Sequence, residues 1–120
     1  MLINLSNHPL EYWSESQLSL ARECWGQVVD LPFPAVDPRA SLGDVQALAE
    51  EYCQKCMELL ADTDGPSAVH LMGEMVFCYN LVALLKKEGI CVVASTTTRN
   101  VRYSQSSKEV LFEFVTFREY

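Results

Sequence analysis

The residues of this chain that could do chemistry lie in three short polar stretches. Each stretch follows an apolar run that is typical of a buried strand: Ser6-Asn7-His8-Pro9, Gly73-Glu74 and Ser95-Thr96-Thr97-Thr98-Arg99. Together they supply an amide, an imidazole, a carboxylate, several hydroxyls and a guanidinium. The hydroxyls and the guanidinium suit a phosphate or a ribose, and the imidazole could move a proton near neutral pH.

Each of these residues also has a purely structural interpretation. Asn7 could cap a turn, and Glu74 could cap the helix that follows it, where the helix dipole favours a negative charge. His8 could be an exposed loop histidine, and the Ser-Thr run could form turns at a sheet edge. His70 lies within an apolar strand, so we interpret it as a hydrogen-bonded core histidine.

The central element of the chain is a strand and helix pair that begins at Ala68. Gly65-Pro66 breaks the chain before it. A helical pattern runs from Met75 to Lys87, and Gly89 ends it. The strand ends at Gly73-Glu74. In open α/β sheets, ligands bind outside the carboxyl ends of the strands, so Glu74 is expected at that edge.

The remaining elements follow from apolar periodicity, capping residues and proline. A helix is expected after Ser14, which forms a capping box with Gln17, and a second helix from Asp44 to about Leu60. The expected strands are 1–5, 28–31, 90–94, 101–103 and 109–117, with a loop over 32–40 and a turn over 95–99.

Strands that alternate with helices predict an α/β fold with a mostly parallel sheet and helices on both faces. Right-handed crossovers favour the strand order 2-1-3-4-5 with an antiparallel C-terminal strand. We therefore expect one Rossmann-like three-layer sandwich over residues 1–120. The strand order reverses between strands 1 and 3, and this topology brings the three polar stretches together at that switch point.

Composition excludes several classes of function. The net charge of -7 argues against binding of duplex nucleic acid, which needs clustered Lys and Arg. No apolar run is long enough to span a membrane, and the start of the chain lacks a basic region and a cleavage site, so we expect a cytoplasmic protein. Two histidines and scattered carboxylates lack metal-ligand spacing, so neither a metal nor another cofactor is expected.

Five cysteines lie within apolar patterns: Cys24, Cys53, Cys56, Cys78 and Cys91. We expect reduced thiols in the core rather than disulfides. Cys53 and Cys56 form a nominal C-x-x-C pair in the middle of a helix, and both fall on its apolar stripe. Packing is therefore the expected role of this pair.

The last strand is apolar on both faces. Phe112, Phe114, Val115 and Phe117 give it more apolar surface than an edge strand should expose. Cover by a second subunit would explain this, so we expect a homodimer.

The polar turn Ser6-Asn7-His8-Pro9 after strand 1 and the Ser/Thr-plus-Arg turn at 95–99 resemble those of a known group. The pattern is similar over most of the chain to the CARF (CRISPR-associated Rossmann fold) proteins and their single-domain ring nucleases. Such proteins are homodimers that bind cyclic oligoadenylates across the two-fold axis. Ring nucleases cleave these messengers in type III CRISPR antiviral defence.

The resemblance implies cleavage of RNA without a metal, by attack of the ligand's own 2′-OH on the adjacent phosphate. It would make His8, Glu74 and Arg99 the catalytic residues, with His8 moving a proton, Glu74 orienting a ribose hydroxyl and Arg99 holding the phosphate. The ligand-binding residues would be Ser6, Asn7, Gly73, Ser95, Thr96 and Thr97. Glu74 departs from the pattern, because an acid beside a phosphate is unfavourable unless it faces a hydroxyl or pairs with Arg99.

Two other functions remain open from the sequence. Glu74 beside Asn7 resembles the carboxylate nucleophile of nucleoside 2-deoxyribosyltransferases, small α/β oligomers that exchange bases on deoxyribose. The same pocket could also bind a nucleotide without turnover, as a sensor or interaction module. Fold alone does not decide between these functions.

Overall fold

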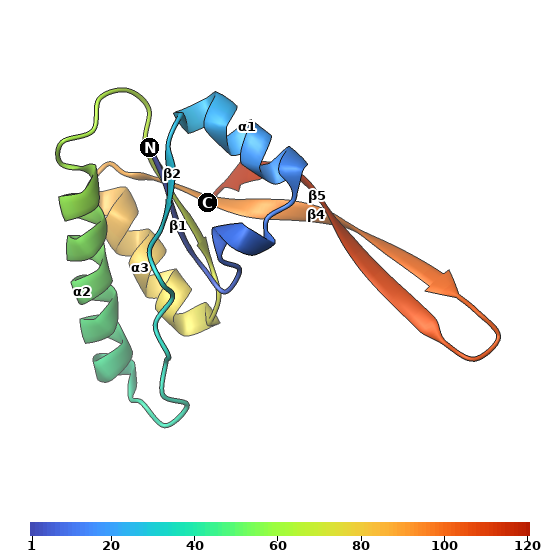
Figure 1. The fold of residues 1–120 in the computed structure, drawn as a ribbon. Coiled ribbons are helices and arrows are strands. Elements are labelled where there is room, and N and C mark those ends of the chain that lie inside the picture. The colour runs from blue at the N-terminus through green and yellow to red at the C-terminus, as the bar shows by residue number, and fades with distance from the viewer.

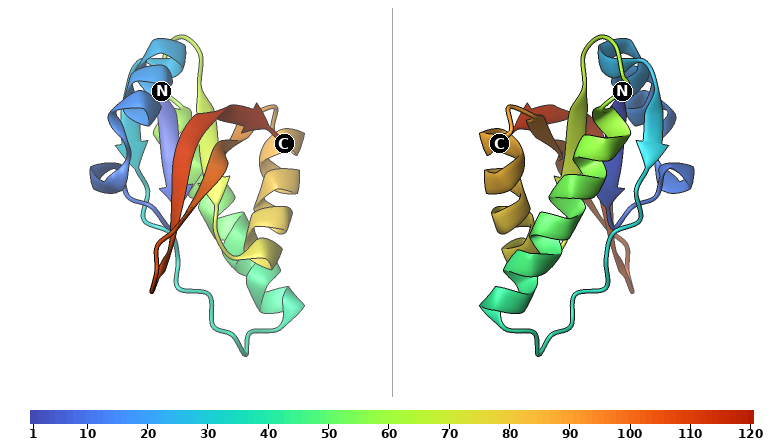
Figure 2. Two further views of the ribbon diagram at one scale, coloured as in Figure 1. Left: turned by 90° about the vertical axis from the view of Figure 1, so that its right-hand side faces the viewer. Right: turned by 90° about the vertical axis from the view of Figure 1, so that its left-hand side faces the viewer.

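The computed structural model describes all residues from 1 to 120 and contains one five-stranded sheet with helices on both faces (Figures 1 and 2). The strands are β1 (Leu2–Ser6), β2 (Val28–Asp30), β3 (Ala68–Met72), β4 (Cys91–Tyr103) and β5 (Lys108–Glu119). The helices are α1 (Glu15–Trp25), α2 (Leu42–Leu60) and α3 (Met75–Lys87), with a short 3-10 helix, η1, at Leu10–Tyr12.

The sheet order is β2-β1-β3-β4-β5, and only the β4–β5 pair is antiparallel. This confirms the α/β class, the expected strand order and the antiparallel final strand. The order reverses between β1 and β3, because β2 lies on the far side of β1 and β4 on the far side of β3. The carboxyl ends of β1 and β3 are therefore the switch point.

Two apolar cores hold the helices against the sheet. The larger core joins alternate residues of β1 and β3, such as Ile3 and Leu71, to buried residues of α2 and α3, including Phe77. The smaller core lies on the other face, where Trp13 and Ala21 pack near Leu2 and Val93. Each strand thus presents successive side chains to opposite layers.

Local signals explain the helix boundaries. Ser14 accepts a hydrogen bond from Gln17 N at the start of α1, which is one half of the predicted capping box; the Gln17 side chain donates to Ser95 Oγ instead. The predicted start of α2, Asp44, was two residues too late. Ser41 is the N-cap and forms a reciprocal capping box with Asp44 at position N3, so the helix begins at Leu42.

The prediction that the cysteines are reduced thiols within the core is confirmed for four residues and is wrong for Cys24. All five thiols are free, and Cys53, Cys56 and Cys78 are buried, with Cys91 half-buried. Burial raises the pKa of Cys56 to about 12 and that of Cys78 to about 11, as expected of thiols that act as packing groups. Cys24 is exposed on α1.

The largest departure from expectation is the length of the final hairpin. The Ser95–Arg99 stretch was expected to be a turn, but it lies inside β4, which pairs with β5 from Val93 to Tyr103. Threonine side chains fit a pleated strand well, and cross-strand pairing with β5 extends the ladder through them. The distal part of this hairpin projects beyond the body of the protein (Figure 1).

Candidate functional site

The site is built at the carboxyl ends of β1 and β3. Ser6 is paired with Met72, and the backbone N–H of Asn7 donates to the Met72 carbonyl at 3.3 Å. The polar turn after β1 therefore lies directly beside Gly73-Glu74. Two of the three polar stretches meet at the switch point.

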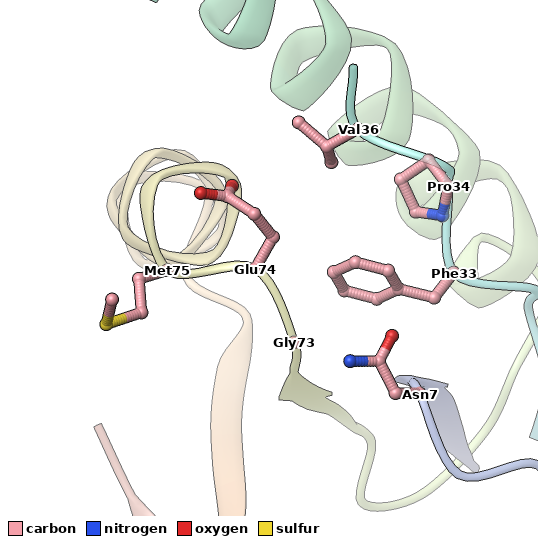
Figure 3. A pocket seen from close by; sticks show the side chains of 7 residues that line it. All are labelled: Asn7, Phe33, Pro34, Val36, Gly73, Glu74 and Met75. Carbon is pink, nitrogen blue, oxygen red and sulfur yellow. The ribbon is translucent and has the colours of Figure 1, made fainter. Parts of the chain in front are cut away.

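A hollow of about 510 Å³ opens at this edge, under the loop that leads from β2 to α2 (Figure 3). Its lining residues are Asn7, Phe33, Pro34, Val36, Gly73, Glu74 and Met75. Two further hollows adjoin it. One, of about 310 Å³, lies beside Ser6 and Asp30, and the other, of about 600 Å³, lies beside Asp37 and Val76. We call these three connected hollows the edge groove.

The edge groove is acidic. Asp30, Asp37 and Glu74 line it, and no lysine or arginine does. A phosphorylated ligand placed here would meet carboxylates without a compensating cation from the same lining. Hydroxyl groups of a ribose suit these carboxylates better, since a carboxylate only accepts hydrogen bonds.

Phe33 forms the wall of the groove at the switch point. Its ring lies over Gly73, where a Cβ atom would overlap it, and it packs edge-on against Phe77 with ring centroids 5.2 Å apart. Glycine at 73 is thus required by the close approach of an aromatic ring. Figure 3 shows the half-exposed ring between Asn7 and Glu74.

Glu74 is the N-cap of α3. Its carboxylate accepts hydrogen bonds from Val76 N at 3.1 Å and Phe77 N at 2.7 Å. These bonds satisfy two N–H groups of the first turn and place a negative charge at the positive end of the helix. The structural interpretation of Glu74 is confirmed, and its carboxylate still borders the groove.

His8 is exposed, but its backbone is fixed. The His8 carbonyl accepts from Asn4 Nδ2 at 2.8 Å and from Trp13 Nε1 at 2.9 Å, and the His8 N–H donates to Ser6 Oγ at 3.2 Å. The imidazole itself forms no hydrogen bond within the chain. It is therefore held at the edge of the sheet by its main chain and is free to meet a ligand.

Behind His8 lies a row of polar side chains that crosses the sheet on the α1 face and is buried at its centre, at Asn4 and His70. Asn4 Nδ2 donates to Asp30 Oδ1 at 2.8 Å, and Asn4 Oδ1 lies 2.9 Å from His70 Nδ1. His70 Nε2 lies 2.7 Å from Ser95 Oγ, which also accepts from Gln17 Nε2 at 3.0 Å. We call these residues, Asp30, Asn4, His70, Ser95 and Gln17, the polar row.

The polar row fixes the protonation of His70. Asn4 uses its amide N–H groups to bond Asp30 and the His8 carbonyl, so its oxygen must accept from His70 Nδ1. Neutral His70 then carries its proton on Nδ1, and Nε2 accepts from the Ser95 hydroxyl. Burial, with a smaller contribution from the charge of His8, lowers the pKa of His70 to about 4, which keeps the ring neutral at pH 7.

Comparison with known proteins gives one match. Residues 1–118 match the model of the uncharacterized protein MJ1673 family. The chain belongs to this family. No curated protein and no solved structure matches it.

Arg99 of this MJ1673 family member lies away from the groove of its own chain. It is paired with Phe112 near the middle of the projecting hairpin, several residues beyond Ser95. The expected convergence of three stretches at one edge is thus wrong for the third stretch, because β4 continues as a strand where a turn was expected. Arg99 is exposed to solvent.

The hydroxyl residues of the same stretch are used within the strand. Ser95 belongs to the polar row, and Thr96 bonds both backbone groups of Thr116 at a β-bulge, each at 3.2 Å. Thr97 is exposed and pairs with Phe114 at the start of the projecting hairpin. None of the three lines the edge groove.

Sequence reasoning missed Asn4, Asp30, Gln17 and Phe33. A signal for the first was present, since Asn4 and Ser6 alternate with Ile3 and Leu5 in a strand that is buried on both faces. Polar residues at every second position of such a strand indicate a hydrogen-bonded row. Phe33 gave no signal, because it lies in a proline-rich loop.

No three histidine, cysteine, aspartate or glutamate side chains lie close enough to hold a metal ion. None of the helices is both long and apolar enough to cross a membrane.

Proposed function

We propose that this protein is a metal-independent ring nuclease that binds cyclic oligoadenylate at the edge groove and acts in type III CRISPR antiviral defence. The observation that carries the proposal is the edge groove itself. It joins a carboxylate and an aromatic ring at the switch point of an open sheet, and the exposed His8 follows the lining residue Asn7 in the chain. The resemblance to CARF proteins and the Rossmann-like three-layer arrangement, with α1 opposite α2 and α3, agree with it.

The aromatic wall suits a base. Phe33 is half-buried, and its ring is held by Gly73 and Phe77. Adenine stacks on such a ring with about 1–3 kcal/mol per base. The remaining edge of the base would face Asn7, whose amide can both donate and accept hydrogen bonds.

The proposed reaction uses the ribose 2′-OH of the ligand as nucleophile. The 2′-oxygen bonds to the adjacent phosphorus as the bond from phosphorus to the 5′-oxygen breaks, which leaves a 2′,3′-cyclic phosphate and a 5′-hydroxyl. His8 takes the 2′-OH proton, and in its protonated form can return a proton to the 5′-oxygen. Glu74 orients a ribose hydroxyl through the lone pairs that α3 does not use, and Asn7 and Ser6 line the same edge.

The polar row holds His8 in place for this role. Asn4 and Trp13 both bond the His8 carbonyl, and Asn4 is itself held by His70 and Asp30. A catalytic imidazole gains from such fixed support, since a displacement of about 1 Å can lower a rate by about 100-fold. His70 is thus a positioning residue in this proposal.

The first test is incubation of the purified protein with cyclic tri-, tetra- and hexa-adenylate in EDTA, followed by chromatography. Linear products that end in a 2′,3′-cyclic phosphate are expected. His8→Ala should reduce the rate by about 100-fold or more, and Glu23→Ala, on the exposed side of α1, should leave it unchanged. Intact ligand together with an unshifted melting temperature would refute the proposal.

A second candidate function is binding without turnover. The hydrogen bonds from α3 to both carboxylate oxygens of Glu74 favour it, because they give the acid at the end of β3 a structural role. The same bonds disfavour Glu74 as a glycosyl nucleophile of the deoxyribosyltransferase type. A raised melting temperature with intact ligand would indicate the sensor, and a trapped glycosyl adduct on Glu74 would indicate the transferase.

A further inference from the structure

The projecting hairpin is an amphipathic ribbon with one apolar face that nothing in the chain covers. We call residues 97–114 the arm. Within β4, only Cys91, Val92 and Val93 pair with β3, so farther along β4 the only neighbouring strand is β5. Figure 1 shows the arm extending away from all of the helices.

The pairing register defines the apolar face of the arm. Residues directly opposite each other in an antiparallel pair point to the same side. Arg99 pairs with Phe112, Val101 with Val110 and Tyr103 with Lys108. One face thus holds Phe112 and Tyr103, which are 65% and 77% exposed, with Arg99 beside Phe112. Apart from Leu111, the other face is polar.

An isolated two-stranded ribbon with such a face is marginally stable in water. The bulge at Thr96 and Thr97 changes the register at the base of the arm, and the aromatic contacts of β5 with α1 end near Phe117. Phe114, at the base of the arm, packs against Phe117, and the rest of the arm has only the β4–β5 ladder to support it. Its apolar face requires a partner.

A second copy of this chain offers the complementary surface. An apolar hollow of about 340 Å³ lies beside the edge groove, on the exposed side of α3. Met75 and Tyr79 border it and are 82% and 77% exposed. The hollow and the groove share Gly73 and Met75, so an apolar surface and an acidic surface adjoin there, as Phe112 and Arg99 adjoin on the arm.

Charge also favours a second copy over an unrelated partner. The arm carries Arg99, Arg102 and Lys108 against Glu109 and Glu113, a net charge of +1. The whole chain has a net charge of -7, so the remainder carries -8. The arm is the basic segment of an acidic protein, and the edge groove, with Asp30, Asp37 and Glu74, is an acidic site that lacks a cation.

We infer that two copies exchange their arms, so that Phe112 of each enters the apolar hollow of the other and Arg99 reaches the partner's edge groove. The exchange is reciprocal and closes a two-fold dimer. Each groove is then built from two chains. The role of Arg99 on a ligand phosphate rests on the proposed function, whereas the exchange of arms does not.

Photo-crosslinking tests the exchange without any ligand. The Phe112→p-benzoylphenylalanine variant is irradiated as an equal mixture of ¹⁴N- and ¹⁵N-labelled protein, and cross-linked peptides are mapped by mass spectrometry. Peptides of mixed isotope that join the arm to the segment around Met75 and Tyr79 are expected. Glu113→p-benzoylphenylalanine, on the opposite face of the arm, should not give them.

Mixing of two inactive variants tests the shared site. In an Arg99→Ala and His8→Ala heterodimer, the exchange leaves one groove with both an intact His8 and an intact partner arginine. If the variants assort at random, the equal mixture should recover about a quarter of the wild-type cleavage rate. If Arg99 acts within its own chain, no complete groove forms and the mixture stays inactive.

The two measurements separate this inference from the proposed function. Cross-links between chains without any cleavage would leave the exchange standing and refute the nuclease. Cleavage by a protein whose arm cross-links only within one chain, or only to the partner's arm, would refute the exchange and leave the nuclease standing. A monomer by sedimentation at micromolar concentration would also overturn the exchange.

Discussion

At the scale of single residues, Glu74 combines a structural role with a place in the groove. Its carboxylate bonds Val76 N and Phe77 N, and loss of an N-cap lowers stability by about 1 kcal/mol. Glu74→Ala should therefore reduce the free energy of unfolding by about that amount, as measured by urea denaturation. Glu50→Ala, on the exposed side of α2, is the control and should change it little. Equal stability of Glu74→Ala and wild type would show that the cap is not formed.

His70 should make the protein less stable in mild acid. Its pKa is lowered from 6.5 in the unfolded chain to about 4 in the folded state, so between these values the unfolded chain binds the proton and the folded protein does not. Stability from the neutral ring is complete above about pH 6.5 and is lost as the pH falls towards 4, by roughly 3 kcal/mol in total.

The measurement is urea denaturation at about pH 7 and about pH 5, with His70→Gln as the comparison. The variant lacks the titrating ring, so its free energy of unfolding should fall less between the two pH values than that of the wild type. Carboxylates titrate in both proteins, so their contribution to the pH dependence is the same and cancels when the two proteins are compared. Parallel pH profiles for the two proteins would contradict the lowered pKa.

At the scale of elements, the loop from β2 to α2 is locked to the end of β3 through one contact. A Cβ atom at Gly73 would overlap the Phe33 ring. Gly73→Ala should therefore displace the ring and destabilise the protein by about 1–3 kcal/mol. In the Phe33→Ala background the same change should have a much smaller effect, because the obstructing ring is gone. A double-mutant cycle with additive effects would show that the ring does not lie on Gly73.

The elements also show what the sequence could and could not predict. Apolar periodicity and capping residues located the three α-helices and the parallel strands, because those signals are local, but they did not indicate the short η1. The Ser95–Arg99 stretch was interpreted as a turn from its polar composition, yet pairing with β5 makes it part of a strand. That pairing joins residues up to 26 apart in β4 and β5, and no local pattern encodes it.

The same reasoning explains the partial success at the site. Asn7, Gly73 and Glu74 were placed together by topology alone, since all follow strands whose order was predicted correctly. Phe33 could not be found in this way, because its position depends on how a long loop packs on the sheet edge. Asp30 ends β2, a strand that was predicted, but its bond to Asn4 was missed. Arg99 was misplaced because residues 95–99 were interpreted as a turn, whereas they belong to β4. An exchange of arms would bring Arg99 to the edge groove of the partner chain.

At the scale of the whole molecule, the uneven distribution of charge should make dimerisation depend on salt. The arm has a net charge of +1 and the rest of the chain -8, and the exchange places Arg99 near the partner's carboxylates. Raising NaCl from about 50 mM to about 500 mM should weaken the dimer by about tenfold in Kd, because exposed charges are screened within a few ångströms at high salt. Analytical ultracentrifugation over a dilution series measures this.

Two variants separate the apolar and the electrostatic parts of that contact. Phe112→Asp should abolish the dimer at both salt concentrations, because it removes the exposed aromatic side chain and would bury a charge in the partner's apolar hollow. Arg99→Gln should weaken the dimer at low salt and leave Kd nearly independent of NaCl. Arg22→Gln, which removes a positive charge from α1 instead, should retain the wild-type salt dependence. If Arg22→Gln and Arg99→Gln respond to salt alike, net charge rather than the arm governs association, and the contact between arm and groove is refuted.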